Sequence, residues 1–200
     1  MGMTIRLVTP AEHGVVGRLT LAAYDAVGTM SPRYRAEMAD TAGRVADGAA
    51  VWVAVDTDTG EMLGAVSFVD RDNPHFEAPE VGDCGFRMLA VAPAAQGRGV
   101  GRALVQHCID HATALGRHRL AIHTMEWMVG AQAMYSAMGF VRRPDRDVVF
   151  PGGPGRVFQR DLTTGAASHF PPPGPIRDPL PWFEDLWAER EAAEDLQQGC

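Results

Sequence analysis

Three glycines at alternate positions, Gly97, Gly99 and Gly101, are the residues whose spacing most directly suggests chemistry. They lie in the stretch QGRGVG, after the apolar run FRMLAVAP and before the helical pattern VGRALVQHCIDHATALG. Glycine lets backbone N–H groups approach a ligand, and the amides at a helix N-terminus attract an anion. A strand, a glycine turn and a helix in this order therefore predict a phosphate cradle. The same glycines also fit a helix start that only permits close packing.

Two familiar phosphate loops are excluded by the sequence. The spacing is G-x-G-x-G rather than the G-x-G-x-x-G of dinucleotide-binding folds. The phosphate loop of nucleoside triphosphatases needs Gly-Lys-Ser/Thr, and this chain contains no lysine. The lack of lysine also excludes a Schiff-base mechanism.

Two motifs together resemble one known family. The pattern Gln96-x-x-Gly99-x-Gly101 after RMLAVAP is similar to the acetyl-CoA signature of the GNAT superfamily of N-acetyltransferases. The stretch AQAMYSAMGF resembles the family's A-x-x-L-Y-x-x-x-G-F, and the two stand at the family's separation. The resemblance covers roughly residues 4–162. It implies transfer of an acetyl group from acetyl-CoA to a primary amine of a small molecule or peptide, by direct attack in a ternary complex.

The resemblance also implies which residues bind acetyl-CoA. Main-chain groups of a splayed central strand would pair with pantetheine, and N–H groups of the glycine loop would bind pyrophosphate. Tyr135 would protonate the departing CoA thiolate as a general acid, although an aromatic residue on this helical face also fits a core position. The expected cofactor-binding residues are Leu89, Ala90, Val91, Gln96, Gly97, Arg98, Gly99, Val100, Gly101, Arg102 and Tyr135.

A base for the incoming ammonium is less clearly indicated. Gly85 occupies a likely position for the family's glutamate, so Glu126 and Glu80 are the candidates, with His123 on the strand before Glu126. Each also fits a solvated acid or a packed histidine, and free amine drawn from solution would need no base. Met128 stands where the family often has an asparagine that contacts CoA.

These departures leave a second hypothesis open. A GNAT-fold module that binds acyl-CoA without catalysis, as a regulatory or assembly protein, would need neither base nor acid. No metal site is predicted, because His107 and His111 stand four apart on a helix without a further ligand and fit an amphipathic surface.

The elements that must position these residues predict an α/β fold. We expect a mixed central sheet of about seven strands flanked by about four helices, with splayed central strands at the CoA site. Helices are expected over residues 14–28, 31–48, 100–116 and 129–139, and AVWVAVD and MLGAVSFVD form a hairpin across TDTG. The loop over residues 71–83 should border the acceptor pocket, where its acids would suit a cationic amine.

Composition divides the chain and limits its partners. Residues 1–164 are expected to form the acetyltransferase domain, and residues 165–200 a proline-rich linker with an acidic amphipathic end. A net charge of −7 argues against nucleic acid, and no apolar run suits a membrane span. Three scattered cysteines indicate a reducing cytoplasm. The aromatic residues of the C-terminal segment suggest a homodimer formed through it, or else a frayed tail.

Overall fold

The computed structural model describes residues 2–28, 30–78, 82–150 and 153–163. The predicted C-terminal segment, residues 165–200, lies outside this part of the chain, and so does the boundary predicted at residue 164. None of the helices that the structure describes has the length and apolar character needed to cross a membrane.

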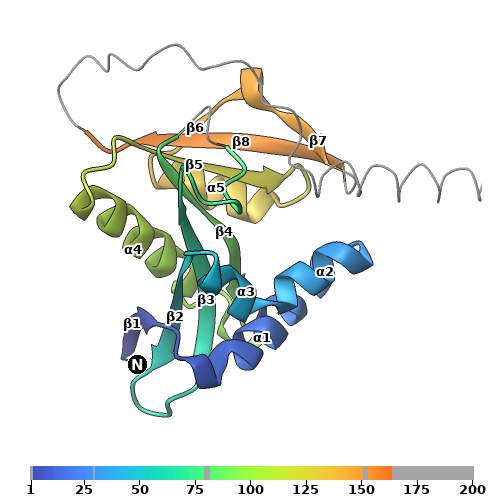
Figure 1. The fold of residues 1–200 in the computed structure, drawn as a ribbon, viewed down its shortest axis with the longest axis vertical. Helices are drawn as coiled ribbons and strands as arrows, with labels where there is room; N and C mark the ends of the chain where they lie inside the picture. Colours follow the sequence, from blue (N-terminus) through green and yellow to red (C-terminus); the bar gives the residue numbers. More distant parts are fainter. Residues whose placement is uncertain (1, 29, 79–81, 151–152, 164–200) are drawn as a thin grey trace, which may run out of the picture.

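The described strands form one mixed sheet (Figure 1). Its order is β1-β2-β3-β4-β5-β8-β6, with β7 paired to β8, and β4 runs parallel to β5 while the other pairs are antiparallel. The strands are β1 Met3–Leu7, β2 Ala50–Asp56, β3 Met62–Asp70, β4 Cys84–Val91, β5 Arg119–Met125, β6 Val141–Arg142, β7 Val148–Phe150 and β8 Gly153–Asp161. The expected α/β class is confirmed. The described sheet has eight strands rather than about seven.

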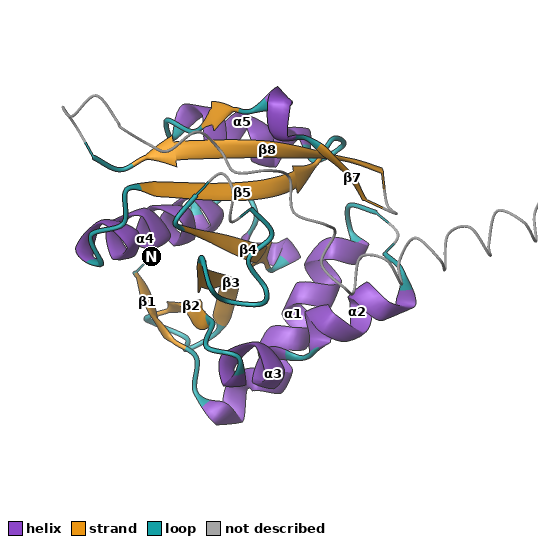
Figure 2. Cartoon of the chain, turned by 45° about the horizontal axis from the view of Figure 1, so that its top comes forward, coloured by secondary structure: helices purple, strands orange, loops and turns teal. Residues whose placement is uncertain are grey.

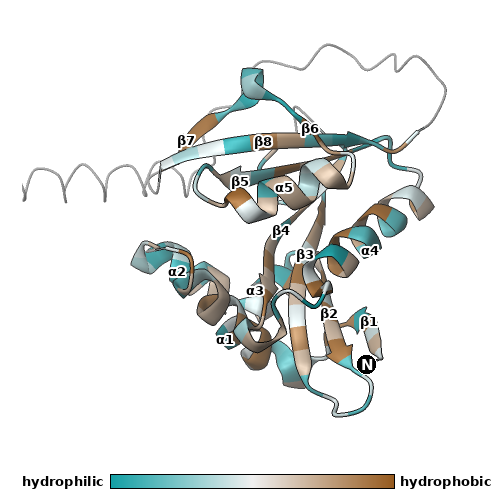
Figure 3. Cartoon of the chain, turned by 180° about the vertical axis from the view of Figure 1, so that it is seen from behind, coloured by the Kyte–Doolittle hydropathy of each residue, from teal (hydrophilic) through white to brown (hydrophobic). Residues whose placement is uncertain are grey.

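Helices cover both faces of the sheet. The described α-helices are α1 His13–Asp25, α2 Pro32–Ala39, α3 Thr41–Ala46, α4 Val100–Ala114 and α5 Val129–Ala137. The first three gather on one side of β2, β3 and β4, and α4 lies on the opposite side (Figure 1, Figure 3). Figure 3 also shows that the strands between these helices are largely apolar. An apolar composition is expected for these strands, because helices bury both faces of the sheet there.

The prediction of one helix over residues 31–48 is wrong. Asp40 ends α2 with non-helical backbone angles, and its carboxylate accepts a hydrogen bond from the Gly43 N–H at 2.8 Å. A short acidic side chain competes in this way with helical hydrogen bonding and caps a new helix. The chain therefore turns at Asp40, and the described residues hold five α-helices rather than about four.

The main core lies on the α4 side of the sheet. It joins Leu104 and Cys108 of α4 with Phe86 of β4, Ile122 of β5 and Tyr135 of α5. Smaller clusters on the opposite side contain Ala121 of β5 together with Val69 and Phe76, and a group of valines from β2 next to α1. Alternate residues of β4 and β5 therefore point to opposite faces.

Candidate active site

A cavity opens where β4 and β5 separate. The two parallel strands pair only at Cys84 with Leu120 and at Gly85 with Ala121, and beyond this point they diverge (Figure 2). Gly85 permits the close approach where they do pair. A Cβ atom added there would lie 2.3 Å from the Ala121 carbonyl oxygen and 2.6 Å from the Phe76 ring. The position that could have carried a catalytic glutamate therefore has no room for a side chain.

A bulge reshapes β4 beside the opening. Ala65 pairs with Ala90 and Ser67 pairs with Arg87, so β4 has one more residue than β3 between these two pairs. Met88, within the bulge, has φ of +52°, a left-handed conformation that is costly for a residue with a side chain. Because β4 has no pairing with β5 beyond Gly85, its N–H and C=O groups on that edge can receive an extended ligand.

The cavity has a volume of about 380 Å³ and walls on both faces of the sheet. On the α4 side it is lined by Phe86, Thr124 and Tyr135. Arg87 and His123 line the α1 side, because each follows or precedes by one position a strand residue that points to the α4 side. The remaining lining residues are Ala23, Tyr24, Val27, Met88, Leu89, Val91, Gln96, Trp127, Met128, Val129, Gly130 and Ala131.

The glycine loop adjoins this cavity at Val91. Gly97 and Gly99 have φ of +74° and +81°, and neither has a heavy atom within 4 Å of an added Cβ, so backbone conformation rather than crowding requires glycine there. The Ala103 N–H is bonded to the Gly99 carbonyl at 3.0 Å, in the first turn of α4. The amides before it belong to the helix N-terminus, where N–H groups lack intrahelical acceptors.

The residues expected to bind acetyl-CoA fall into two groups, with Ala90 apart from both. Leu89, Val91, Gln96 and Tyr135 line the cavity, and the buried Ala90 does not. The second group, Gly97, Arg98, Gly99, Val100, Gly101 and Arg102, forms the adjoining loop and first turn of α4. The Arg98 side chain faces Asp56 at the end of β2 at 3.6 Å, so within this loop the backbone amides remain the candidate anion ligands.

Tyr135 is buried among aromatic side chains at the cavity wall. Its residue is 5% exposed, and its ring centroid lies 5.9 Å from that of Phe86, 5.7 Å from Phe140 and 6.1 Å from Phe158. Burial raises the pKa of the Tyr135 phenol above its ordinary value near 10. The phenol therefore keeps its proton at neutral pH, as a proton donor must.

The residues considered as bases lie in different surroundings. Glu126 is exposed, outside the cavity lining, and its carboxylate pairs with the Arg156 guanidinium. Glu80 lies outside the described residues. His123 lines the cavity, and its Nδ1 lies 3.6 Å from the Glu77 carboxylate.

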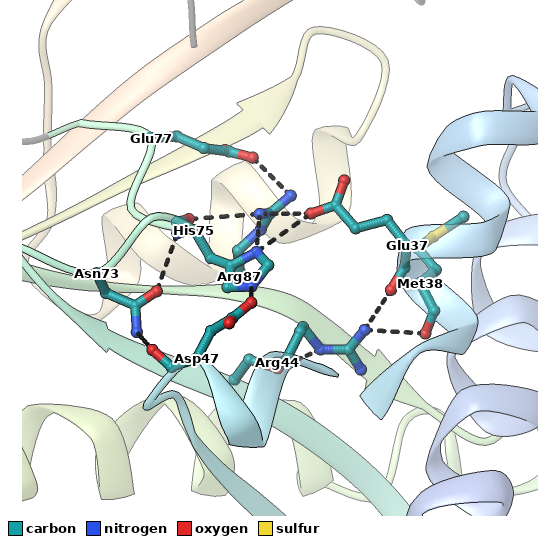
Figure 4. A network of polar contacts seen from close by, with 9 residues as sticks. Glu37, Met38, Arg44, Asp47, Asn73, His75, Glu77 and Arg87 are labelled. Carbon is teal, nitrogen blue, oxygen red and sulfur yellow. Dashed lines mark hydrogen bonds and ion pairs between the residues drawn. The ribbon is translucent and has the colours of Figure 1, made fainter. Parts of the chain in front are cut away.

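A buried polar cluster supports the α1 side of the cavity (Figure 4). The Arg87 guanidinium lies 2.8 Å from the Glu37 carboxylate of α2 and 2.9 Å from that of Glu77. Burial alone would lower the pKa of Arg87, but Glu77, Tyr34 and Glu37 outweigh it and raise that pKa. This cluster is not predicted from the sequence, because the strand that carries Arg87 reads there as an almost unbroken apolar run. An arginine inside such a run, near a loop rich in acids, was the available signal.

His107 and His111 serve a packing role in α4. Their rings meet the Trp52 ring edge-on, with centroids 4.2 and 5.4 Å away. Among the residues that the structure describes, no three His, Cys, Asp or Glu side chains are placed to hold a metal ion.

Comparison with known proteins points to one family. The family model described as Acetyltransferase (GNAT) family matches residues 18–140. Mycothiol acetyltransferase of Paenarthrobacter aurescens (strain TC1) is 34% identical over 93 residues, which is 46% of this chain and 27% of that relative. The chain thus matches only about a quarter of that relative's length.

Solved structures share the fold. A GNAT acetyltransferase of Staphylococcus aureus Mu50 is 15% identical with a TM-score of 0.64, over 81% of this chain and 100% of the other. A GCN5-related N-acetyltransferase of Kribbella flavida is 24% identical with a TM-score of 0.62, over 80% and 98%. A Salmonella typhimurium structure, described as an acetyltransferase with its cofactor acetyl-CoA, is 22% identical with a TM-score of 0.61, over 88% and 100%. At these identities the likeness shows the fold alone.

Proposed function

Because the chain belongs to the GNAT family of acetyltransferases, we propose that it transfers an acetyl group from acetyl-CoA to a primary amine by direct attack in a ternary complex. The observation that carries this proposal is the conjunction of the opening between β4 and β5 with the glycine turn that starts α4. The opening suits an extended arm, and the turn suits the phosphates at its end.

The residues of the cavity fit acetyl-CoA without requiring charge from side chains. The free edge of β4 near Leu89 and Val91 would pair with the pantetheine arm, and amides of residues 96–102 would bind the pyrophosphate. A backbone N–H of β4 aimed at the thioester oxygen would stabilise the negative charge that develops on it. Met128, at the N-cap of α5, would replace the usual asparagine contact with an apolar one.

In the proposed reaction the amine nitrogen forms a bond to the acetyl carbon, and the carbon–sulfur bond then breaks. The departing sulfur needs a proton, which the buried Tyr135 phenol would supply as general acid. The attacking nitrogen must lose one proton before its attack and another after it.

For that proton acceptor, His123 has the strongest support. It lines the cavity on the α1 side, and the Glu77 carboxylate beside Nδ1 would stabilise the protonated ring. The roles considered for Glu126 and Glu80 stay predictions. The exposure of Glu126 and its pairing with Arg156 do not favour a role as the proton acceptor.

The experiment that tests the function combines binding with turnover. Calorimetric titration with acetyl-CoA is expected to give a one-to-one complex, and CoA release is expected with at least one member of a panel of primary amines. Absence of acetyl-CoA binding would overturn the proposal. Tight binding without turnover on any amine would instead favour the non-catalytic acyl-CoA module.

The glycine loop gives the first prediction for a variant. Gly99→Ala places a side chain at φ +81°, which should cost about 1–2 kcal/mol in this conformation. Relief of that strain would turn the loop amides away, so we expect acetyl-CoA affinity, measured by calorimetry, to fall at least about tenfold.

Gly116→Ala provides the matched control at the other end of α4. Gly116 has φ of +69° and, like Gly99, has no heavy atom within 4 Å of an added Cβ. The Gly116→Ala variant should lose about as much stability as Gly99→Ala and keep its affinity for acetyl-CoA. Equal loss of affinity in both variants would show that the loop amides do not bind the cofactor.

His123 gives the second prediction. His123→Gln is expected to lower kcat/KM by about 10- to 100-fold near pH 7, with a deficit that shrinks toward about pH 10, where an alkylamine loses its own proton. The measurement is kcat/KM against pH for both forms, with Glu126→Gln in parallel. If Glu126→Gln shows this profile and His123→Gln does not, the base is Glu126.

A homodimer formed through residues 165–200 also stays a prediction, since that segment lies outside the described residues.

A further inference from the structure

The α1 side of the cavity is mostly apolar and ends in one polar cluster. Ala23 and Tyr24 of α1, Val27 just after that helix and Trp127 of the β5–α5 loop form the apolar part. Arg87 and its neighbours form the polar part. If acetyl-CoA occupies the glycine-loop side as proposed above, this side receives the acceptor, so the inference below rests on the proposed function.

The apolar part is open at its mouth. Val27 is 50% exposed and Trp127 is 36% exposed, so both side chains are open to solvent where they line the cavity. A Cβ atom added to Gly28 would lie 3.1 Å from the Trp127 ring, so the indole packs on the end of α1. A flat apolar group entering the cavity would cover both exposed side chains and remove them from water.

Arg87 is the only arginine among the described cavity-lining residues, and its positive charge is already paired with carboxylates of the protein. Its two terminal nitrogens each lie within 3 Å of a carboxylate, that of Glu37 and that of Glu77. The side chain is 5% exposed, so little of the guanidinium can be reached by an acceptor. An acceptor carboxylate would have to displace Glu37 or Glu77 and leave it partly buried without its arginine partner.

The other charges around Arg87 do not supply a spare cation. His75 lies 2.9 Å from the Asp47 carboxylate and 3.5 Å from that of Glu37, and hydrogen bonding to Glu37 raises its pKa. Arg44 lies behind Glu37 and donates to the carbonyls of Glu37 and Met38 rather than toward the cavity (Figure 4).

None of the cations described in this cluster is therefore left over for an acceptor carboxylate. Arg87 pairs with both Glu37 and Glu77, and Asp47 pairs with His75 when that ring is protonated. Glu77 lies next to two residues of the lining, 2.9 Å from Arg87 and 3.6 Å from His123.

We propose that the acceptor is a primary amine on a flat apolar body, with no carboxylate beside the amine, and that Glu77 sets this preference. Glu77 cancels the charge of Arg87 toward the cavity and leaves a carboxylate beside the place where an ammonium would arrive. The apolar mouth formed by Val27 and Trp127 would hold the body of the acceptor.

The test uses acceptors that differ by one group, with the wild-type protein and saturating acetyl-CoA. For 2-phenylethylamine, kcat/KM is expected to exceed that for phenylalanine by about 100-fold or more, because a carboxylate in this site would stay unpaired. Phenylalaninamide, which keeps the substituent without its charge, is expected to exceed phenylalanine by at least about tenfold. Equal use of phenylalanine and 2-phenylethylamine would overturn the proposal.

Two variants identify the residues responsible. Glu77→Gln should reduce the ratio of 2-phenylethylamine to phenylalanine by at least about tenfold, because Arg87 then loses one counter-charge. A ratio taken within one variant cancels any effect on proton transfer, and an unchanged ratio would remove Glu77 from the proposal. Trp127→Ala, at the exposed mouth, should reduce the preference for 2-phenylethylamine over ethylamine by about tenfold. An unchanged preference would overturn the apolar body.

Failure of this inference is distinguishable from failure of the proposed function. If acetyl-CoA binds and none of these amines is acetylated, the acceptor class is wrong while the cofactor assignment stands. If acetyl-CoA does not bind, the proposed function itself is wrong. The wild-type ratios need no variant, so poor folding of Glu77→Gln cannot rescue the proposal.

Discussion

Replacing Tyr135 with phenylalanine is expected to lower kcat by about 10²–10⁴-fold, the usual contribution of a positioned general acid. The phenol lines the cavity beside the splayed strands, and burial raises the pKa of Tyr135 above its ordinary value, so the group stays protonated. Without it, the CoA sulfur would leave as a free thiolate or take its proton from water.

The same variant should bind acetyl-CoA almost as the wild type does. The ring of Tyr135 packs among Phe86, Phe140 and Phe158, and phenylalanine preserves those contacts. The expected signature is therefore a lower kcat with a nearly unchanged dissociation constant, measured by steady-state kinetics and calorimetry. Equal loss of binding and rate would indicate a packing role, and an unchanged kcat would remove Tyr135 from the reaction.

Burial also fixes the pH dependence expected of this acid. A raised pKa means that the neutral phenol is present at every pH below about 10, the ordinary value for tyrosine. Between neutral pH and that value, kcat of the wild type and of Tyr135→Phe should therefore depend on pH in the same way. A decline seen only in the wild type would mean that the phenol ionises there.

The features that could be predicted from sequence are those encoded over a few neighbouring residues. Gly97 and Gly99 occupy left-handed positions in a turn, which only local backbone conformation decides. Tyr135 and Gly139 lie within one helix and its end, so their spacing alone identifies the helix and its termination. Continuous apolar runs likewise reveal buried strands such as β4.

Other features depend on contacts between distant parts of the chain. Glu37, Glu77 and Arg87 come from α2, a loop and β4, and no periodicity brings them together. The separation of β4 from β5 follows from a bulge and from the close contact at Gly85, and both exist only once the strands pair. The break at Asp40 is an intermediate case. Aspartate is a residue type that caps helices, but the helical spacing continues on both sides of Asp40 and predicts one helix.

Replacing Arg87 with methionine is expected to lower the free energy of unfolding by about 3–5 kcal/mol, the usual cost of removing one partner of a buried ion pair. Methionine keeps much of the volume, so the loss is electrostatic. Glu37 and Glu77 would both remain partly buried without their shared cation. Arg117→Met is the matched control, because Arg117 pairs with Asp70 at the surface, and such pairs contribute about 1 kcal/mol or less.

The pH dependence of this loss gives a second measurement of its cause. In the wild type the pKa of Glu37 is lowered: burial alone would raise it, but His75 and Arg87 outweigh burial. Its stabilising contribution is thus present above the ordinary glutamate pKa and is lost as pH falls through the lower folded value. Without Arg87 the folded pKa of Glu37 should rise, because burial is then opposed mainly by His75. The variant would then gain stability relative to the wild type as pH falls from about 7 to about 4.

Denaturant unfolding of both forms at several pH values separates the explanations. If the deficit of Arg87→Met narrows at low pH, and if Glu77→Gln in the same chain recovers part of it at neutral pH, the cost is that of buried unpaired carboxylates. A deficit that is independent of pH would indicate lost packing instead. A deficit no larger than that of Arg117→Met would mean that water reaches the cluster, and the acceptor selectivity attributed to Glu77 would then lose its electrostatic basis.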